Sequence, residues 1–180
     1  MASPISCLSI LIIPLLVTSL FYDVSNADRA LLEKVWKKSM DHDFCLSVLL
    51  SDPDGLTNIL YRLGLVSTCK SLGIISDVNT GEIPNVLEGV TDPNDRSRIL
   101  DCRTDIHSLY GDMELAYNAA GTQSYQEEAT MLASGQKKIT ECNKRFESPP
   151  KHESPISSST SKITKLINIS SVIVSMITSS

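Results

Sequence analysis

The chain has 180 residues and a formal net charge of −5 at pH 7, from 16 basic and 21 acidic side chains. This balance lacks the strongly basic field that nucleic-acid binding requires, so it excludes that class of function. Hydrophobic residues make up 42% of the chain, which is sufficient for one domain with its own core.

Residues 1–27 are predicted to be a signal peptide. Ile5 to Tyr22 is an apolar run, and Ser25-Asn26-Ala27 places small residues where signal peptidase cleaves. A signal anchor is the alternative, because the apolar run is long; the lack of Lys and Arg before the run is atypical of a signal peptide. Cleavage after Ala27 would export residues 28–180 as one domain.

Residues 28–51 are predicted to form a short helical hairpin. Arg29 to Met40 is amphipathic, Asp41-His42-Asp43 is typical of a turn, and Phe44 to Leu50 is a second short helix. Asp52-Pro53-Asp54 then predicts the start of a long helix, since an acidic N-cap followed by proline favours that position.

The first long helix is expected to end near Asp77. Apolar side chains at Leu56, Ile59, Leu60, Leu63 and Val66 give it helical periodicity. Asn79-Thr80-Gly81 is expected to break it, and a short piece follows from Pro84 to Leu87.

Asp92-Pro93-Asn94-Asp95 repeats the start signal and predicts a helix from Pro93 to Ala120. Its apolar residues recur every three or four positions, as in a bundle helix, at Ile99, Cys102, Ile106, Leu109, Met113 and Ala116 or Tyr117. Gly121 is expected to end this helix and Thr122 to cap the next. That helix has one side formed by Tyr125, Ala129, Leu132, Gln136, Ile139 and Phe146, with Cys142 one position off the line.

Ser148 to Ser161 is rich in serine and proline and predicts an exposed connection. Lys162 to Thr178 is then expected to be the last helix, with a lipid-anchor signal and a transmembrane helix as alternatives. Asn168-Ile169-Ser170 is a glycosylation sequon. Together these elements predict an all-α fold, an up-down four-helix bundle over residues 52–180 preceded by the hairpin.

Removal of the signal peptide would take away Cys7 and leave Cys45, Cys69, Cys102 and Cys142. Four cysteines in an exported chain favour two disulfides, and three pairings are open. Cys102 and Cys142 lie on two predicted long helices, so a bond between them would tie those helices together. Two buried reduced thiols are the alternative, and no spacing matches a zinc site.

Residues suited to catalysis are few. The histidines are His42 in a turn, His107 beside an apolar stripe and His152 in the linker. Asp101 and Asp105 are one helical turn apart, as a general acid and base would be, but this spacing is also typical of a solvated face. Nucleophile elbows, phosphate-binding glycine loops and zinc motifs are missing from the sequence, so we expect neither an enzyme nor a cofactor.

The ordered motifs of the chain resemble the plant invertase and pectin methylesterase inhibitor family. The similarity spans Leu31 to Ile177 and is greatest to the branch described as invertase inhibitors, which includes pollen allergens. The residues that carry it fall into four groups: Asp43-Phe44-Cys45-Leu46 with Leu49-Leu50-Ser51-Asp52-Pro53; Leu100-Asp101-Cys102 with Leu109-Tyr110; Tyr125, Glu141-Cys142 and Phe146; and Ser154-Pro155-Ile156 with Leu166, Ile169, Ser170 and Ile173.

One departure from the family concerns the hairpin. The family has a cysteine nine residues before the one that Cys45 matches, and this chain has Trp36 there. The usual hairpin disulfide therefore cannot form, which leaves Cys69 as a replacement partner for Cys45, or two free thiols. The resemblance also implies a Cys102–Cys142 disulfide, whose loop of about 40 residues would stabilise the fold by about 4 kcal/mol.

The resemblance implies a secreted inhibitor, in the cell wall or the vacuole, that covers the substrate cleft of a carbohydrate enzyme. Pectin methylesterase is the first expected target and acid invertase the alternative, because the Pro-Lys-Phe segment of invertase inhibitors is missing and Ser124-Tyr125-Gln126 stands in its region. A non-inhibitory binding module is a third hypothesis, prompted by Trp36. Exposed polar contact candidates, for which solubility is the competing role, are Asp95, Arg98, Arg103, Asp112 and Glu114.

Overall fold

The computed structural model describes residues 29–55, 57 and 59–179. The predicted signal peptide therefore lies outside the described residues. Within them, residues 29–38 are helical and α2 runs over His42–Leu50, which gives the expected N-terminal hairpin. Asp41 starts α2, since its Oδ1 accepts a hydrogen bond from the backbone N of Phe44 at 3.0 Å.

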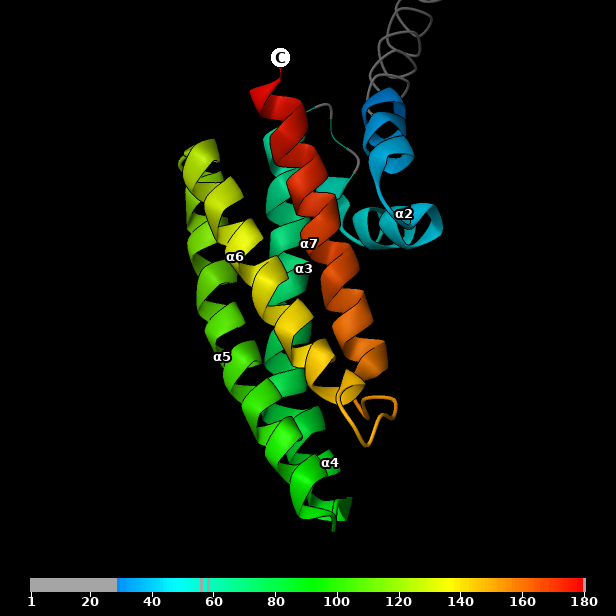
Figure 1. The fold of residues 1–180 in the computed structure, drawn as a ribbon. Helices are drawn as coiled ribbons and strands as arrows, with labels where there is room; N and C mark the ends of the chain where they lie inside the picture. Colours follow the sequence, from blue (N-terminus) through cyan, green and yellow to red (C-terminus); the bar gives the residue numbers. More distant parts are fainter. Residues whose placement is uncertain (1–28, 56, 58, 180) are drawn as a thin grey trace, which may run out of the picture.

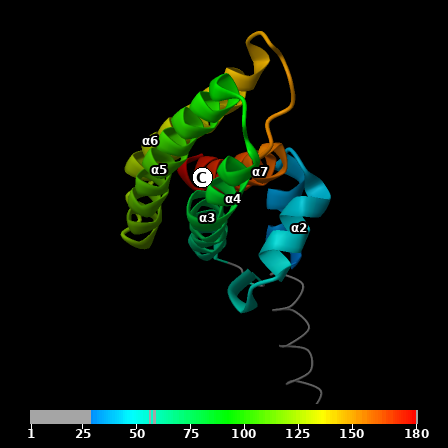
Figure 2. The ribbon, with the colours of Figure 1, turned by 90° about the horizontal axis from the view of Figure 1, so that it is seen from below.

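Four long helices form an up-down bundle beside the hairpin (Figure 1). They are α3 (Leu60–Asp77), α5 (Pro93–Gly121), α6 (Tyr125–Lys144) and α7 (Ser157–Thr178). Seen along the bundle, α5 and α6 form one side and α2 lies on the opposite side, next to α7 (Figure 2). The all-α bundle that the sequence predicts is thus confirmed.

The predicted helix start at Asp52 is wrong. Pro53–Gly55 forms only a short 3-10 turn, η1, and α3 begins at Leu60. Gly55 packs so closely on α2 that a Cβ atom there would overlap the carbonyl oxygen of Leu49. This contact holds the segment in a turn, and Asp52 caps that turn by accepting a hydrogen bond from the N of Asp54.

The predicted break at Asn79-Thr80-Gly81 is also wrong. A π-helical turn, η2 (Val78–Glu82), joins α3 to α4 (Ile83–Gly89) without leaving the helix. Val78 and Ile83 are both buried in the core, so the wider turn keeps apolar side chains inward. Thr80 donates its hydroxyl hydrogen back to the carbonyl of Ser76, four residues earlier, so its polar side chain is satisfied within the helix.

The start of α5 follows the prediction, because Oδ1 of Asp92 accepts hydrogen bonds from the N of Asn94 and of Asp95. Thr122, by contrast, does not cap α6. Its hydroxyl donates to carbonyl groups at the end of α5, and the chain reverses at Gln123, whose φ is 58°. Thr122 therefore closes one helix, and Ser124 precedes the next.

The connection after α6 is shorter than predicted. It comprises the turn η3 (Arg145–Glu147) and the segment that leads to Ser157, where α7 begins. Ser154 and Ile156 are buried, although the whole segment was expected to be exposed, because Ile156 is anchored in the core. No helix in the described ranges is both long and apolar enough to cross a bilayer.

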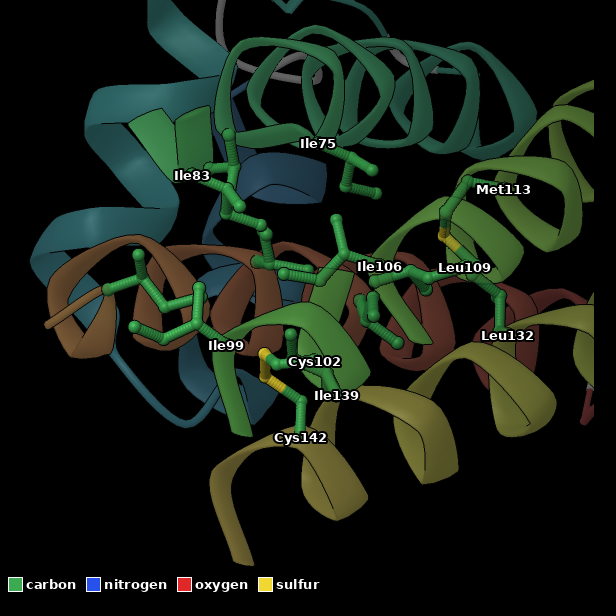
Figure 3. Packing of buried hydrophobic residues seen from close by; sticks show 14 of the residues in the cluster. Ile75, Ile83, Ile99, Cys102, Ile106, Leu109, Met113, Leu132, Ile139 and Cys142 are labelled. Atoms are coloured by element: carbon green, nitrogen blue, oxygen red, sulfur yellow. A yellow bond between two sulfur atoms is a disulfide. The ribbon is translucent and has the colours of Figure 1, made fainter. Parts of the chain in front are cut away.

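The bundle core contains the Cys102–Cys142 disulfide, which joins α5 to α6 (Figure 3). Both sulfurs are buried among isoleucine and leucine side chains, including Ile99, Ile106 and Ile139. A second apolar cluster seats the hairpin on α3 and α7 and consists of Leu32, Val35, Cys45, Leu49, Leu63, Val66, Ile169 and Ile173.

Candidate interaction surface

The two acids that resemble a catalytic pair are held by an arginine. Arg145 donates from Nε and Nη2 to Oδ2 of Asp105, at 3.1 and 2.6 Å, and its Nη1 lies 3.9 Å from Asp101. This contact bridges α5 and the turn that follows α6. The geometry gives Asp105 a structural role in fastening the two helices.

Asp95 and Arg98, two of the predicted contact residues, instead fasten the connection between α6 and α7. Arg98 donates to the carbonyl oxygens of Ser148, Pro149 and Pro150. Oδ1 of Asp95 lies 2.6 Å from Nε2 of His152. Both side chains therefore hold a loop rather than project toward a partner.

His152 has a hydrogen-bond acceptor at each ring nitrogen. Nδ1 lies 3.0 Å from the carbonyl oxygen of Glu153, and Nε2 faces Asp95. Both nitrogens donate only when the ring is protonated. The Glu153 carbonyl first, and Asp95 second, raise the pKa of His152 above its usual value.

Asp112, a third predicted contact residue, forms an ion pair between helices. Its Oδ2 lies 2.6 Å from Nζ of Lys138 on α6, and 14% of its side chain is exposed. Among the five residues predicted for contact, only Arg103 and Glu114 are exposed, and neither forms an ion pair with another described residue.

Four large apolar or aromatic side chains of α5 are exposed beside Arg103 and Glu114. They are Leu100, Tyr110, Leu115 and Tyr117, with exposed fractions of 42%, 36%, 50% and 38%. We call the side of α5 that carries Leu100, Arg103, Tyr110, Glu114 and Tyr117 the outer α5 face; Leu115 lies about 140° around the helix from Tyr110 and is not part of it. Tyrosine and arginine are the side chains that dominate binding energy in protein interfaces, so the composition of this face is suited to a protein partner.

A hollow of about 370 Å³ adjoins one end of the outer α5 face. Tyr117 lines it from α5, and Tyr61, Arg62, Leu65 and Cys69 line it from α3. Such a hollow next to exposed tyrosines could accept a side chain of a partner. The contact residues predicted from the sequence were all polar and did not include these tyrosines. Tyr110 lies off the predicted buried stripe, whereas Tyr117 was one of two alternatives for its last position and is the exposed one.

Cys45 and Cys69 are free thiols and do not form the replacement disulfide. Cys45 is buried in the hairpin cluster, whereas Cys69 is exposed at the hollow on α3. Burial raises the pKa of the Cys45 thiol, which keeps it protonated. The ring of Trp36 packs against that of His42, with 5.0 Å between centroids.

Asn168, the predicted glycosylation site, is half-buried on α7. Its Oδ1 accepts a hydrogen bond of 2.8 Å from the backbone N of Met40, so the side chain helps to hold the hairpin. Glycosylation of this residue stays a prediction. Among the residues that the structure describes, no group of histidine, cysteine or acidic side chains is arranged to hold a metal ion.

No protein-family model and no curated protein sequence matches the chain. Among solved structures, a mutant form of a pectin methylesterase inhibitor from Arabidopsis matches with a TM-score of 0.71 and 16% identity. The match covers 81% of this chain and 95% of that one.

The chain has the fold of a pectin methylesterase inhibitor. A second structure of a pectin methylesterase inhibitor from Arabidopsis matches with a TM-score of 0.61 and 16% identity, over 78% of this chain and 91% of that one. The resemblance found in the sequence is therefore confirmed as a pectin methylesterase inhibitor fold. Both neighbours are inhibitors of an enzyme rather than enzymes.

Proposed function

We propose that this protein is a secreted inhibitor of a plant cell-wall carbohydrate enzyme, and that its first target is pectin methylesterase. The observation that carries the proposal is the match to a pectin methylesterase inhibitor over 95% of that inhibitor's length. The exposed tyrosines on the outer α5 face support it, because an inhibitor of this kind needs a binding surface and no catalytic group.

The proposed mechanism is occlusion of the substrate cleft. A rigid bundle that buries roughly 800 Å² per partner would form an ordinary stable complex. Tyr110 and Tyr117 are the proposed anchors, and Arg103 is the proposed polar contact, because all three are exposed on the same side of α5. The disulfide below this face keeps α5 and α6 in fixed register during binding.

The first test is titration of the purified, oxidised protein against a pectin methylesterase and an acid invertase at pH 5. We expect loss of esterase activity with the protein at micromolar excess. Loss of invertase activity alone would assign the alternative target. If neither enzyme is inhibited, inhibition is wrong and the non-inhibitory binding module becomes the better hypothesis.

The second test locates the contact surface. Replacement of both tyrosines, Tyr110→Ala with Tyr117→Ala, should weaken inhibition at least tenfold, because exposed aromatic anchors supply much of the binding energy. Lys137→Ala is the matched control, since Lys137 is an exposed residue of α6. If the double tyrosine variant inhibits as strongly as Lys137→Ala, the assignment of the outer α5 face is contradicted.

A further inference from the structure

Glu128 is buried inside the bundle although it is an acidic residue. It lies in the first turn of α6, and 1% of it is exposed. Gly64 of α3 lies opposite: a Cβ atom added there would be 3.8 Å from Oε1 of Glu128 and 3.5 Å from Cγ2 of Ile173 on α7. The carboxyl group is thus enclosed where α3, α6 and α7 meet.

Among the residues that the structure describes, no cation is placed to balance the charge of this carboxyl group. Its Oε1 is buried and accepts no hydrogen bond from the described residues. On α3 the nearest cation in sequence, Arg62, is exposed and lies 3.9 Å from Asp54. On α7 Lys165 forms an ion pair with Asp41 at 2.7 Å, and no charged residue follows it in that helix.

The other charged groups near this end of the bundle are acidic. Glu127, the neighbour of Glu128 on α6, is exposed, and so is Glu114 on α5. The start of α6 offers a helix dipole that favours an anion, but this effect is small beside the cost of burying an unpaired charge. Burial accordingly raises the pKa of Glu128 to about 7.

We propose that Glu128 is a buried protonation site that makes the folded bundle more stable at acidic than at neutral pH. While it carries its proton, the neutral side chain packs between α3 and α7. When the proton leaves near neutral pH, the buried carboxylate weakens the packing of α6 against these two helices. The consequence for inhibition rests on the proposed function: the binding face on the adjoining helix would be best ordered in acidic surroundings.

The direction of the pH effect follows from the two states of the chain. The pKa is 4.5 for an ordinary glutamate and about 7 in the fold, so the unfolded chain loses this proton first as pH rises. The contribution of Glu128 to stability is therefore greatest in acid and falls between these two values. The folding equilibrium constant should fall on the order of 100-fold between pH 4 and pH 8 from this group alone.

Urea unfolding of three proteins at pH 4 and pH 8 tests the proposal. The variants are Glu128→Gln, which removes the proton site, and Glu127→Gln, which removes an exposed carboxyl group one residue away. We expect wild type and Glu127→Gln to lose far more stability at pH 8 than Glu128→Gln does. An equal pH dependence in wild type and Glu128→Gln would overturn the proposal.

Direct titration covers the case in which Glu128→Gln does not fold. In wild-type protein labelled with ¹³C at glutamate side chains, the assigned Glu128 carboxyl resonance should titrate near pH 7. Titration near pH 4.5 would overturn the proposal. Neither experiment uses a target enzyme, so failure here is distinguishable from failure of the inhibitor assignment.

Discussion

Gly135 shows how closely α5 and α6 approach each other. A Cβ atom at Gly135 would lie 2.7 Å from Cδ1 of Leu109 and 2.7 Å from Cε of Met113. Those atoms are the ends of flexible side chains, so they would have to move within a filled core. The glycine therefore allows this close approach, although it lies in the interior of a helix.

Gly135→Ala is expected to destabilise the fold by up to about 2 kcal/mol, because an overpacking cost of about 1–3 kcal/mol outweighs a gain of about 0.5–1 kcal/mol in helix propensity. Gly111→Ala is the control, because nothing lies within 4 Å of a Cβ atom at that position of α5. The control should be about 0.5–1 kcal/mol more stable than wild type, since alanine is the better helix former. Urea midpoints measure both effects, and a stabilised Gly135→Ala would contradict the close approach.

Gly64 offers a way to give the buried carboxyl group a partner. A serine hydroxyl at this position would extend from a Cβ atom 3.8 Å from Oε1 of Glu128, within reach of a hydrogen bond. We expect Gly64→Ser to reduce the loss of stability between pH 4 and pH 8. Gly64→Ala, which adds the Cβ atom without the donor, should keep the wild-type pH dependence.

The buried residues of α6 were only partly predictable from the sequence. The predicted stripe passed through Ala129 and Gln136, whereas the buried set is Glu128, Leu132, Gly135, Ile139 and Cys142. Both lines have helical spacing. Hydrophobicity favours the wrong one, because the correct line contains a glutamate and a glycine. Their burial depends on the facing helices, since Gly64 lies opposite Glu128, and Leu109 and Met113 lie opposite Gly135.

At the scale of elements, the connection between α6 and α7 depends on Arg98. Its guanidinium group binds three consecutive carbonyl groups, of Ser148, Pro149 and Pro150. The bound loop also donates from the N of His152 to the carbonyl of Phe146. One side chain of α5 thus satisfies three consecutive carbonyl groups of this segment and fixes its path.

Arg98→Ala should release this loop while the bundle stays folded. Hydrogen exchange at the amide of His152 should become faster, because the loop that it belongs to loses three hydrogen bonds. Arg103→Ala is the matched control, since Arg103 is exposed on the same helix. Unchanged exchange in Arg98→Ala would show that other contacts hold the loop.

His152 should make the same loop sensitive to pH. Its pKa is raised in the fold, so its contribution is fully present below the ordinary value of 6.5 and is lost as pH rises through the raised value. An NMR titration of its ring protons should give a midpoint above 6.5 in wild type and a lower one in Asp95→Asn. An unshifted midpoint in wild type would contradict the two hydrogen bonds.

Helix starts were predictable where a local cap decides them and not where a distant contact does. Asp92 starts α5 as expected, because its carboxylate caps the first turn by itself. The same signal at Asp52 fails, because Gly55 is pressed against Leu49 of another helix. Local sequence cannot report that contact.

At the scale of the whole molecule, one covalent link joins the two helices that pack on each other along the outer side of the bundle. Cys102 and Cys142 are 40 positions apart, and both lie at buried positions of helical stripes. The motif resemblance made this pair predictable. The absence of a bond between Cys45 and Cys69 was not predictable, because it depends on how the hairpin packs against α3.

Removal of the disulfide in Cys102→Ala with Cys142→Ala should cost about 4 kcal/mol of stability, mostly through a freer unfolded chain. Cys69→Ser is the control, because that thiol is exposed and unbonded. Urea unfolding under non-reducing conditions measures both. A double variant as stable as wild type would contradict a structural role for the bond.

The disulfide also divides the chain in its response to mechanical force. Tension applied to the two ends of the chain acts on the hairpin, α3 and α7. At Cys102 the force is transmitted through the disulfide to Cys142, so the residues between these two cysteines bear none of it. The oxidised chain should therefore extend about 140 Å less than the reduced chain, at roughly 3.5 Å per residue. Most of α5 and nearly all of α6 lie in the segment that the disulfide closes, so they would bear no force while the rest of the chain is extended.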